Sequence, residues 1–481
     1  MRKAGPACGA PRARSPRALR LAVACALLWP GAIRAFPGLA PLNRAPRFDP
    51  LAVDIRTEVL GNGLTIVVEA QPRTPEVAVQ LHVRVGARDE GAGEGGCAHL
   101  FEHLMFEGSL NAPGRLYDTA TAGVGILNNA YTTADATVYT SLLRREGLDR
   151  VLFLESDRLG YLAPLTPEAL KNQQDVVLQE RAESYDAPYG READALTRLV
   201  WPEGHPYHTP VIGTVEDIRS FDADAVRAFH RRAYSPGNAV LVIVGDVDPD
   251  EALRAARRWF AELPAGEGRL ARPTAAEVPW APARVDGLLE DHVESWSLSL
   301  GWPAPPAGHP DALALELATY LLSDGRGSRL DDALLYDHRR ASDVAAWLSP
   351  GELGSELVVW GQTHRPRLTR LAQRLEAELL GIAARPPSPE ELRRAKESMR
   401  DDLIDQLGEV EPRAELIGAC VSRGRAPDCF LADLAAVQAL DAEAIAAAVA
   451  AHAVPASRRS LSVVPDGRRG ALVGASPVAL P

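Results

Sequence analysis

A strand, a turn and a helix follow one another twice along this chain, once on each side of a segment rich in Pro, Ala and Gly. In the first copy, the strand covers residues 77–85 and the helix covers residues 98–106. In the second copy, the strand covers residues 295–301 and the helix covers residues 311–322. A repeat on this scale is typical of two related units that each bury a core. The chain is therefore expected to fold as two homologous halves.

The length of the chain agrees with this division. At 481 residues, 46% of them hydrophobic and 24% charged, the chain is too long for one ordinary core and has the composition of a folded protein. We predict an N-terminal domain at 36–265, a linker at 266–285 and a C-terminal domain at 286–481. The first half mixes a hairpin at 57–69 with helices and later strands, without strict alternation. This pattern favours an α+β fold in which two halves, each a largely antiparallel sheet covered by helices, form a clamshell.

The first 35 residues are typical of a targeting segment. They contain seven basic residues and no acidic residue, followed by a short apolar run and by small residues near Ala35. We predict a cleaved signal peptide at 1–35 and a periplasmic mature protein. A lipoprotein that uses Cys25 and an uncleaved anchor are the alternatives. The apolar run is too short to span a bilayer comfortably, and no stable membrane span is expected in the mature chain.

Charge and cysteine content exclude some classes of protein. Removing the seven basic residues changes the formal net charge from −12 to −19. Such an acidic protein repels nucleic acid and anionic lipid, but it does not exclude cationic peptides.

Three cysteines remain in the mature chain, which are too few for a disulfide scaffold. Cys420 and Cys429 either pair across a short loop or stay free, and Cys97 is read as a small packed residue or as a regulatory thiol.

The strongest chemical signal is the sequence His99-Leu100-Phe101-Glu102-His103. On a helix, positions 99 and 103 lie one turn apart on the same face, so the two imidazoles can hold one metal ion. Glu102 faces the same side and is placed to take a proton from a water bound to the metal. A buried histidine pair beside a surface glutamate is the alternative reading.

A catalytic zinc ion requires a third protein ligand and an open position. Glu180 is the candidate on a helix predicted at 167–184, and Glu183 competes with it one turn later. Spacing alone does not choose between the two carboxylates. For His205 and His208 we favour a plain loop, because no third ligand is spaced to join them.

Four sequence blocks resemble the pitrilysin, insulin-degrading enzyme and mitochondrial processing peptidase family. They are the metal-helix block at 96–109, a strand block at 128–139, the block at 176–180, and the pair of blocks at 205–207 and 211–213. The resemblance implies that His99, His103 and Glu180 hold one zinc ion and that Glu102 is the general base. It also implies that a peptide adds as a strand beside Asn129 or Ala130, although Asn129 can equally be a turn residue.

The second half departs from the family pattern. The block at 327–330 resembles the family's characteristic turn, but the positions expected for an Arg and a Tyr that reach the active site hold Leu335 and Ser342. Arg329 and Tyr336 are seven residues apart, as the family's Arg and Tyr are, but they fall at different positions relative to the turn. The role is therefore not transferred to them. Because some bacterial members divide the two parts between chains, we predict a homologous partner subunit or a homodimer.

These observations predict an exported zinc metalloendopeptidase that hydrolyses extended or unstructured peptides. One rival is a non-catalytic, zinc-binding subunit of a peptidase-like complex. Another is a zinc-binding protein without hydrolase activity, which would be indifferent to Glu102→Gln.

Overall fold

The computed structural model describes residues 51–480, apart from residues 115, 273, 275–282, 326, 337–339 and 469. The predicted signal peptide at 1–35 lies outside the described residues, as does part of the linker at 266–285. The signal, and with it the export of the chain, stays a prediction, as do the domain boundaries.

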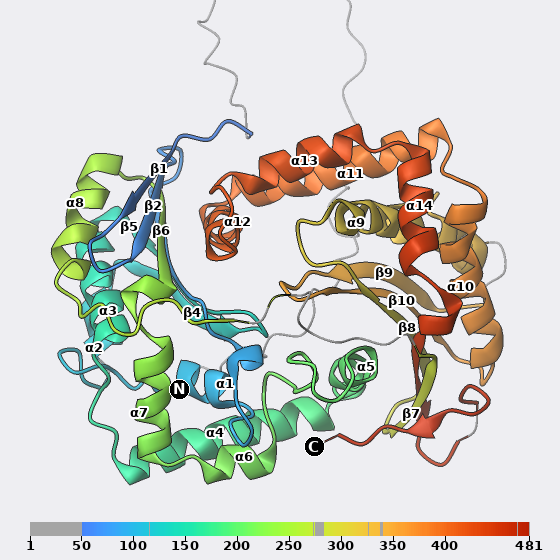
Figure 1. The fold of residues 1–481 in the computed structure, drawn as a ribbon, viewed down its shortest axis with the longest axis horizontal. Coiled ribbons are helices and arrows are strands. Elements are labelled where there is room, and N and C mark those ends of the chain that lie inside the picture. The colour runs from blue at the N-terminus through green and yellow to red at the C-terminus, as the bar shows by residue number, and fades with distance from the viewer. Residues whose placement is uncertain are drawn as a thin grey trace, which may run out of the picture.

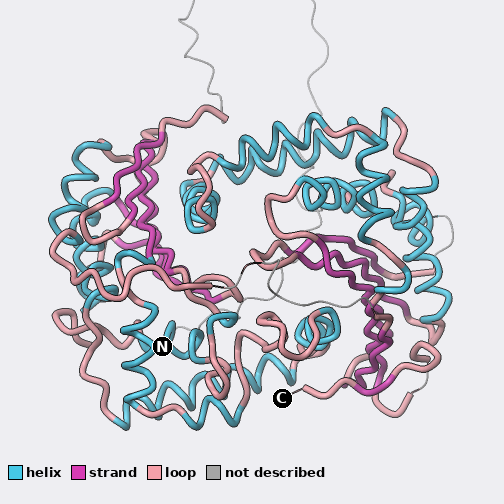
Figure 2. Tube along the Cα trace, in the orientation of Figure 1, coloured by secondary structure: helices cyan, strands magenta, loops and turns pink. Residues whose placement is uncertain are grey.

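The N-terminal half is built on a six-stranded sheet with the order β1-β2-β6-β3-β5-β4 (Figures 1 and 2). Its strands are β1 (Ile55–Val59), β2 (Thr65–Ala70), β3 (Glu76–Val83), β4 (Gly125–Thr132), β5 (Thr137–Arg144) and β6 (Ala239–Gly245). Neighbouring strands are antiparallel except for the parallel pair β2 and β6. The hairpin expected at 57–69 is present as β1 and β2.

The C-terminal half repeats this sheet in the order β12-β7-β11-β8-β10-β9. Its strands are β7 (Val285–Asp291), β8 (Trp296–Ala304), β9 (Asp343–Ser349), β10 (Ser355–Thr363), β11 (Arg459–Pro465) and β12 (Ser476–Pro477). Strands β7, β8, β9, β10 and β11 correspond in place to β2, β3, β4, β5 and β6, and β7 and β11 are parallel as β2 and β6 are. Strand β12 lies beside β7 as β1 lies beside β2, but β12 is parallel to its neighbour whereas β1 is antiparallel. The predicted α+β fold with two homologous halves is therefore confirmed.

Helices cover the sheets. The N-terminal half contains α1 (Cys97–Leu104), α2 (Leu116–Thr121), α3 (Leu148–Gly160), α4 (Pro167–Asp186), α5 (Glu192–Val200), α6 (Val215–Ser220), α7 (Ala223–Ala233) and α8 (Pro249–Phe260). The C-terminal half contains α9 (Pro310–Ser323), α10 (Leu368–Ala384), α11 (Pro389–Gly408), α12 (Val410–Ser422), α13 (Cys429–Ala439) and α14 (Ala442–His452). Several of them begin at a side-chain cap followed by Pro, as in α4, where the Thr166 hydroxyl accepts a hydrogen bond from the amide of Ala169.

The two halves face each other as a clamshell, and each half sends one helix onto the sheet of the other (Figure 1). Helix α12 packs on β3 and β6, and α5 packs on β11 and β8. The cluster beneath α12 joins Val67 and Val242 of the first sheet to Ala414 and Ile417. This exchange explains why almost every residue of β3 is buried, although a strand with one covered face would alternate.

Each of these two helices places an ionisable side chain against the opposite sheet. On α12, the fully buried Arg413 donates to the Glu69 carboxylate of β2, with a distance of 2.6 Å from Nε to Oε2. On α5, the Glu192 carboxylate accepts hydrogen bonds from the hydroxyls of Ser297 and Ser299 on β8, both at 2.7 Å. The contact between the halves is therefore polar as well as apolar.

Two further features bear on the sequence analysis. Cys420 and Cys429 form a disulfide that ties α12 to α13, and Cys97 is a buried free thiol. Among the described residues, no single helix is long and apolar enough to cross a membrane, although the bent pair α13 and α14 meets that test of length and composition when taken together.

Candidate metal centre

The backbone is tightly packed at the N-terminus of α1, the helix that carries the histidine motif. Gly96 precedes α1 with a φ of 89°, and a Cβ atom there would lie 2.8 Å from the carbonyl oxygen of Ile212. Glycine is therefore required at this position. The Glu90 carboxylate accepts hydrogen bonds from the amides of Gly96 at 3.0 Å and Ala98 at 2.8 Å, and burial raises its pKa to about 8. Glu90 thus caps α1, a role that the sequence analysis did not assign.

Packing decides which face of α1 is open. Leu100 and Phe101 are fully buried, and the Phe101 ring lies 4.4 Å from the Tyr234 ring, centroid to centroid. This anchors the apolar face to the N-terminal core and leaves the polar stripe on the other side. The helix expected at 98–106 ends at Leu104, so Phe106 lies beyond it and is 37% exposed.

His99, His103 and Glu180 come together between α1 and α4. A ligand atom from each of the three lies within 4.8 Å of the others. The Nε2 atom of His103 is 3.2 Å from Glu180 Oε2, and that of His99 is 3.9 Å from the same oxygen. Two imidazole nitrogens and a carboxylate oxygen are a donor set found in catalytic zinc sites. This donor set fits a zinc ion, and it is the only group of this kind among the described residues.

Helix α4 is held so that Glu180 faces α1. The Gln174 side chain donates to the carbonyl of Ile218 at 2.7 Å, and Arg181 donates to the carbonyl of Gly213 at 3.2 Å. Glu183, the competing carboxylate, is exposed, accepts a hydrogen bond from Gln179 and does not belong to the cluster. The choice that spacing left open therefore follows from how α4 is anchored.

The protonation of the cluster suits metal binding. Burial lowers the pKa of His99 to about 4, so its imidazole is neutral near pH 7. The hydrogen bond from His103 holds the pKa of Glu180 below its ordinary value, which keeps the carboxylate ionised. Neutral imidazole and ionised carboxylate are the forms that bind a metal.

Glu102 lies beside this cluster in a different environment. It is 8% exposed, and burial raises its pKa above the ordinary value. Its Oε2 atom accepts a hydrogen bond from the hydroxyl of Thr132, at the end of β4, at 2.6 Å. Thr132 was not among the residues expected at the site, although alternation along the strand places it on the same face as Ala130.

Strand β4 ends the sheet, so one of its edges has no partner strand among the described residues. Asn129 is exposed and Ala130 is buried, and they pair on the other edge with Thr140 and Tyr139 of β5. Asn129 is therefore part of a strand and not of a turn.

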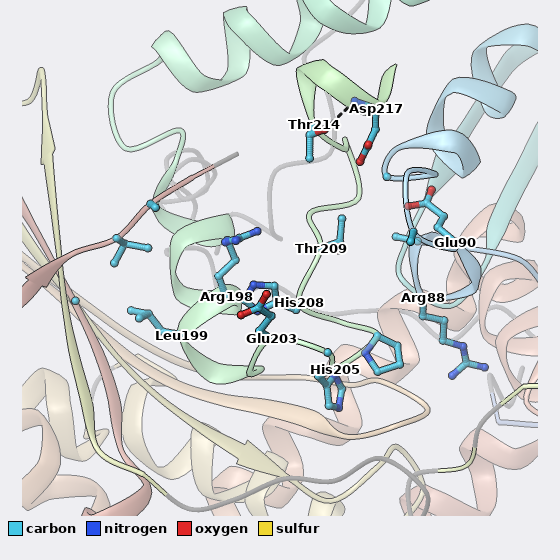
Figure 3. A pocket seen from close by; sticks show the side chains of 18 of the residues that line it. Arg88, Glu90, Arg198, Leu199, Glu203, His205, His208, Thr209, Thr214 and Asp217 are labelled. Carbon is cyan, nitrogen blue, oxygen red and sulfur yellow. Dashed lines mark hydrogen bonds between the residues drawn. The ribbon is translucent and has the colours of Figure 1, made fainter. Parts of the chain in front are cut away.

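His205 and His208 lie in a loop that lines a separate cavity of about 940 Å³ (Figure 3). The cavity lining includes neither motif histidine nor Glu180. His205 Nδ1 accepts from the amide of Tyr207, and His208 Nδ1 donates to the carbonyl of Trp201. Both rings are engaged by their own loop, which agrees with the plain loop reading.

Arg329, in the block that resembles the family's turn, is engaged within its own half. Arg329 is buried and donates to the Glu391 carboxylate at 2.9 Å and to the carbonyl of Arg385 at 3.1 Å. Tyr336 is 51% exposed, and Leu335 packs against the C-terminal core. Arg329 therefore serves the packing of its own half.

Comparisons with known proteins give a consistent picture. Residues 65–212 match the family described as Insulinase (Peptidase family M16), and residues 220–399 match its domain described as Peptidase M16 inactive domain. The chain is 30% identical to the zinc protease PqqE of Helicobacter pylori over 287 residues, which are 59% of this chain and 64% of that protein. The match thus spans slightly less than two thirds of that relative.

Two solved structures share the fold. A protease from Helicobacter pylori matches with a TM-score of 0.78 and 23% identity, over 86% of this chain and all of that chain. The periplasmic protease PqqL of Escherichia coli matches with a TM-score of 0.69 and 20% identity, over 85% of this chain and 47% of that chain. With these matches, the resemblance seen in the sequence is confirmed, and the chain belongs to the M16 family of metallopeptidases, the family of pitrilysin and insulinase.

Proposed function

We propose that this chain is a zinc metalloendopeptidase that hydrolyses extended or unstructured peptides. His99, His103 and Glu180 would hold one zinc ion, and Glu102 would act as the general base. A zinc ion bound there would supply a Lewis acid that polarises the scissile carbonyl and makes water more acidic.

One observation carries the proposal: the metal-type donor set formed by α1 and α4 lies beside Glu102, a separate buried carboxylate on α1. Glu180 is ionised and engaged by His103, whereas burial raises the pKa of Glu102. Pairs of carboxyl groups whose surroundings push their pKa values apart are typical of sites that divide binding and proton transfer.

The open edge of β4 supports a peptide as substrate. An extended chain can add to an unpaired strand edge through main-chain hydrogen bonds, with Asn129 and Ala130 at the point of contact. Two exposed apolar side chains of β4, Ile126 and Leu127, would contact the substrate's side chains.

We further propose that the active site is completed by a homologous partner subunit or by a second copy of this chain. The support is that Arg329 is engaged within its own half and that this chain matches about half of the length of PqqL. PqqL is described as periplasmic, which agrees with a periplasmic location for this chain after signal removal.

The test is hydrolysis of a mixed pool of unstructured peptides by the mature chain, alone and with a homologous M16 chain from the same source. We expect cleavage that requires zinc and stops in Glu102→Gln while zinc stays bound. Cleavage that persists in Glu102→Gln would contradict the proposed base.

A second candidate is a non-catalytic, zinc-binding subunit. It is favoured by Leu335, which occupies the position expected for the Arg, and by the match of residues 220–399 to a domain described as inactive. Zinc binding without cleavage in any mixture would favour this candidate.

A further inference from the structure

The hydroxyl of Thr132 has one proton, and its neighbours show where that proton goes. Thr132 Oγ1 lies 2.6 Å from Glu102 Oε2 and 3.4 Å from the Oγ1 atom of Thr137. Thr137 uses its own proton on the carbonyl of Val85, at 3.0 Å. A carboxylate only accepts hydrogen bonds. The proton of Thr132 is therefore committed to Oε2 of Glu102.

The two carboxylate oxygens of Glu102 are in different environments, because only one of them accepts this hydrogen bond. Oε2 is held by Thr132, whereas Oε1 receives no hydrogen bond from the described residues and is not among the buried atoms that lack a partner. Oε1 is thus the oxygen that water can reach.

The strand that holds Glu102 is also the strand with the open edge. Thr132 is the last residue of β4, and Ala130, two positions earlier, shares its face and packs into the N-terminal core that includes Leu100 and Phe101 of α1. Any movement of β4 would therefore displace the hydroxyl that orients the base.

We propose that Thr132 is a positioning residue: it fixes Oε2 of Glu102 and leaves Oε1 as the atom that takes the proton from the attacking water, so that the strand that receives the peptide also orients the base. This inference rests on the proposed function. The water O–H bond breaks as its oxygen bonds to the peptide carbonyl carbon, and the proton moves to Oε1. When the C–N bond breaks, Glu102 passes that proton to the leaving nitrogen and becomes a carboxylate again.

The first experiment compares Thr132→Val, which keeps the shape and removes the hydroxyl, with Thr132→Ser, which keeps the hydroxyl. We expect Thr132→Val to lower kcat about 10- to 100-fold while KM stays within about twofold, because a second-layer hydrogen bond that orients a reacting group has an effect of this size. Thr132→Ser should restore kcat to within about threefold of the wild type. Zinc content should be unchanged in both.

Two controls separate positioning from general damage. Thr57→Val changes an exposed threonine on β1, at the opposite end of the same sheet, and should leave kcat unchanged. Thermal unfolding of Thr132→Val should match that of the wild type, so that a loss of kcat cannot be attributed to a loss of folding. A wild-type kcat in Thr132→Val, or a loss in Thr132→Ser as large as the loss in Thr132→Val, would overturn the proposal.

A readout that does not depend on activity keeps this inference separate from the proposed function. In crystal structures, Glu102 should occupy one rotamer in the wild type and in Thr132→Ser, but several rotamers in Thr132→Val. If the wild type cleaves no peptide, the proposed function fails, and the crystal structures decide the positioning role alone. An unchanged Glu102 in Thr132→Val would then overturn it.

Discussion

The same pair of helices is bridged in two different ways in the two halves. In the N-terminal half, α1 and α4 are joined where His103 meets Glu180 at 3.2 Å. In the C-terminal half, the corresponding helices α9 and α11 are joined by the hydroxyl of Tyr320, which donates to the Asp402 carboxylate at 2.7 Å. Helix α9 is longer than α1 and is mostly apolar and buried. One scaffold thus supports a metal-type cluster in one half and an ordinary hydrogen bond in the other.

The two helices that pack on the sheet of the opposite half, α5 and α12, differ in a similar way. Arg413 of α12 meets an oppositely charged group on the first sheet, whereas Glu192 of α5 meets only neutral donors on the second. The duplication conserves the positions of the elements, and the chemistry at each contact differs between the halves.

The largest difference between the halves should appear in metal binding. Glu180→Gln removes the proposed anionic ligand, and we expect zinc affinity to fall by more than about 100-fold, since even the loss of a second-layer partner costs 10- to 100-fold. Competition with a chelator measures this affinity. The matched variant Asp402→Asn removes the carboxylate charge from the corresponding bridge of α11 and should leave affinity unchanged. Equal losses of zinc affinity in both variants would contradict the view that the two bridges differ in metal binding.

The next effect concerns the stability of the contact that α12 makes with the N-terminal sheet. Arg413→Met leaves the buried Glu69 carboxylate without its partner, so we expect the free energy of unfolding to fall by about 3–5 kcal/mol. Denaturant titration measures it, and Arg400→Met, at an exposed position of α11, is the control. A change below about 1 kcal/mol would show that the ion pair does not stabilise the contact between the halves.

A smaller effect should come from the disulfide, since α12 has one and α5 contains no cysteine. Reduction opens a loop with a sequence separation of 9 and should destabilise the protein by about 2–3 kcal/mol. Thermal unfolding with and without reductant tests this. The double variant Cys420→Ser with Cys429→Ser should already be destabilised and should not respond to reductant; a response would point to another cause.

A further effect should be a pH dependence of the contact made by α5. Burial raises the pKa of Glu356, on β10 against α5, to about 7, above its ordinary value of 4.5. The folded state then holds a proton that the unfolded state has released, so this group's contribution is full below about pH 4.5 and is lost as pH rises through about 7. Glu356→Gln should flatten the decline in unfolding free energy across this window, whereas Glu290→Gln, at an exposed position of β7, should not. An unchanged slope in Glu356→Gln would contradict the assignment.

Much of the fold followed from local patterns. The repeated strand, turn and helix predicted two related halves because alternation and helical spacing depend on neighbouring residues. The spacing of His99 and His103 predicted one shared face for the same reason. The end of α1 was placed two residues too late, since an apolar residue such as Phe106 continues the pattern without continuing the helix.

The sequence by itself determined the two-half organisation, the histidine pair and the family resemblance. Only the tertiary structure distinguished Glu180 from Glu183, because the rotation of α4 depends on contacts of Gln174 and Arg181 with distant loops. The cap at Glu90, the hydrogen bond from Thr132 to Glu102 and the exchange of α5 and α12 were likewise decided by tertiary contacts. They join residues far apart in sequence, and no local periodicity encodes such a contact.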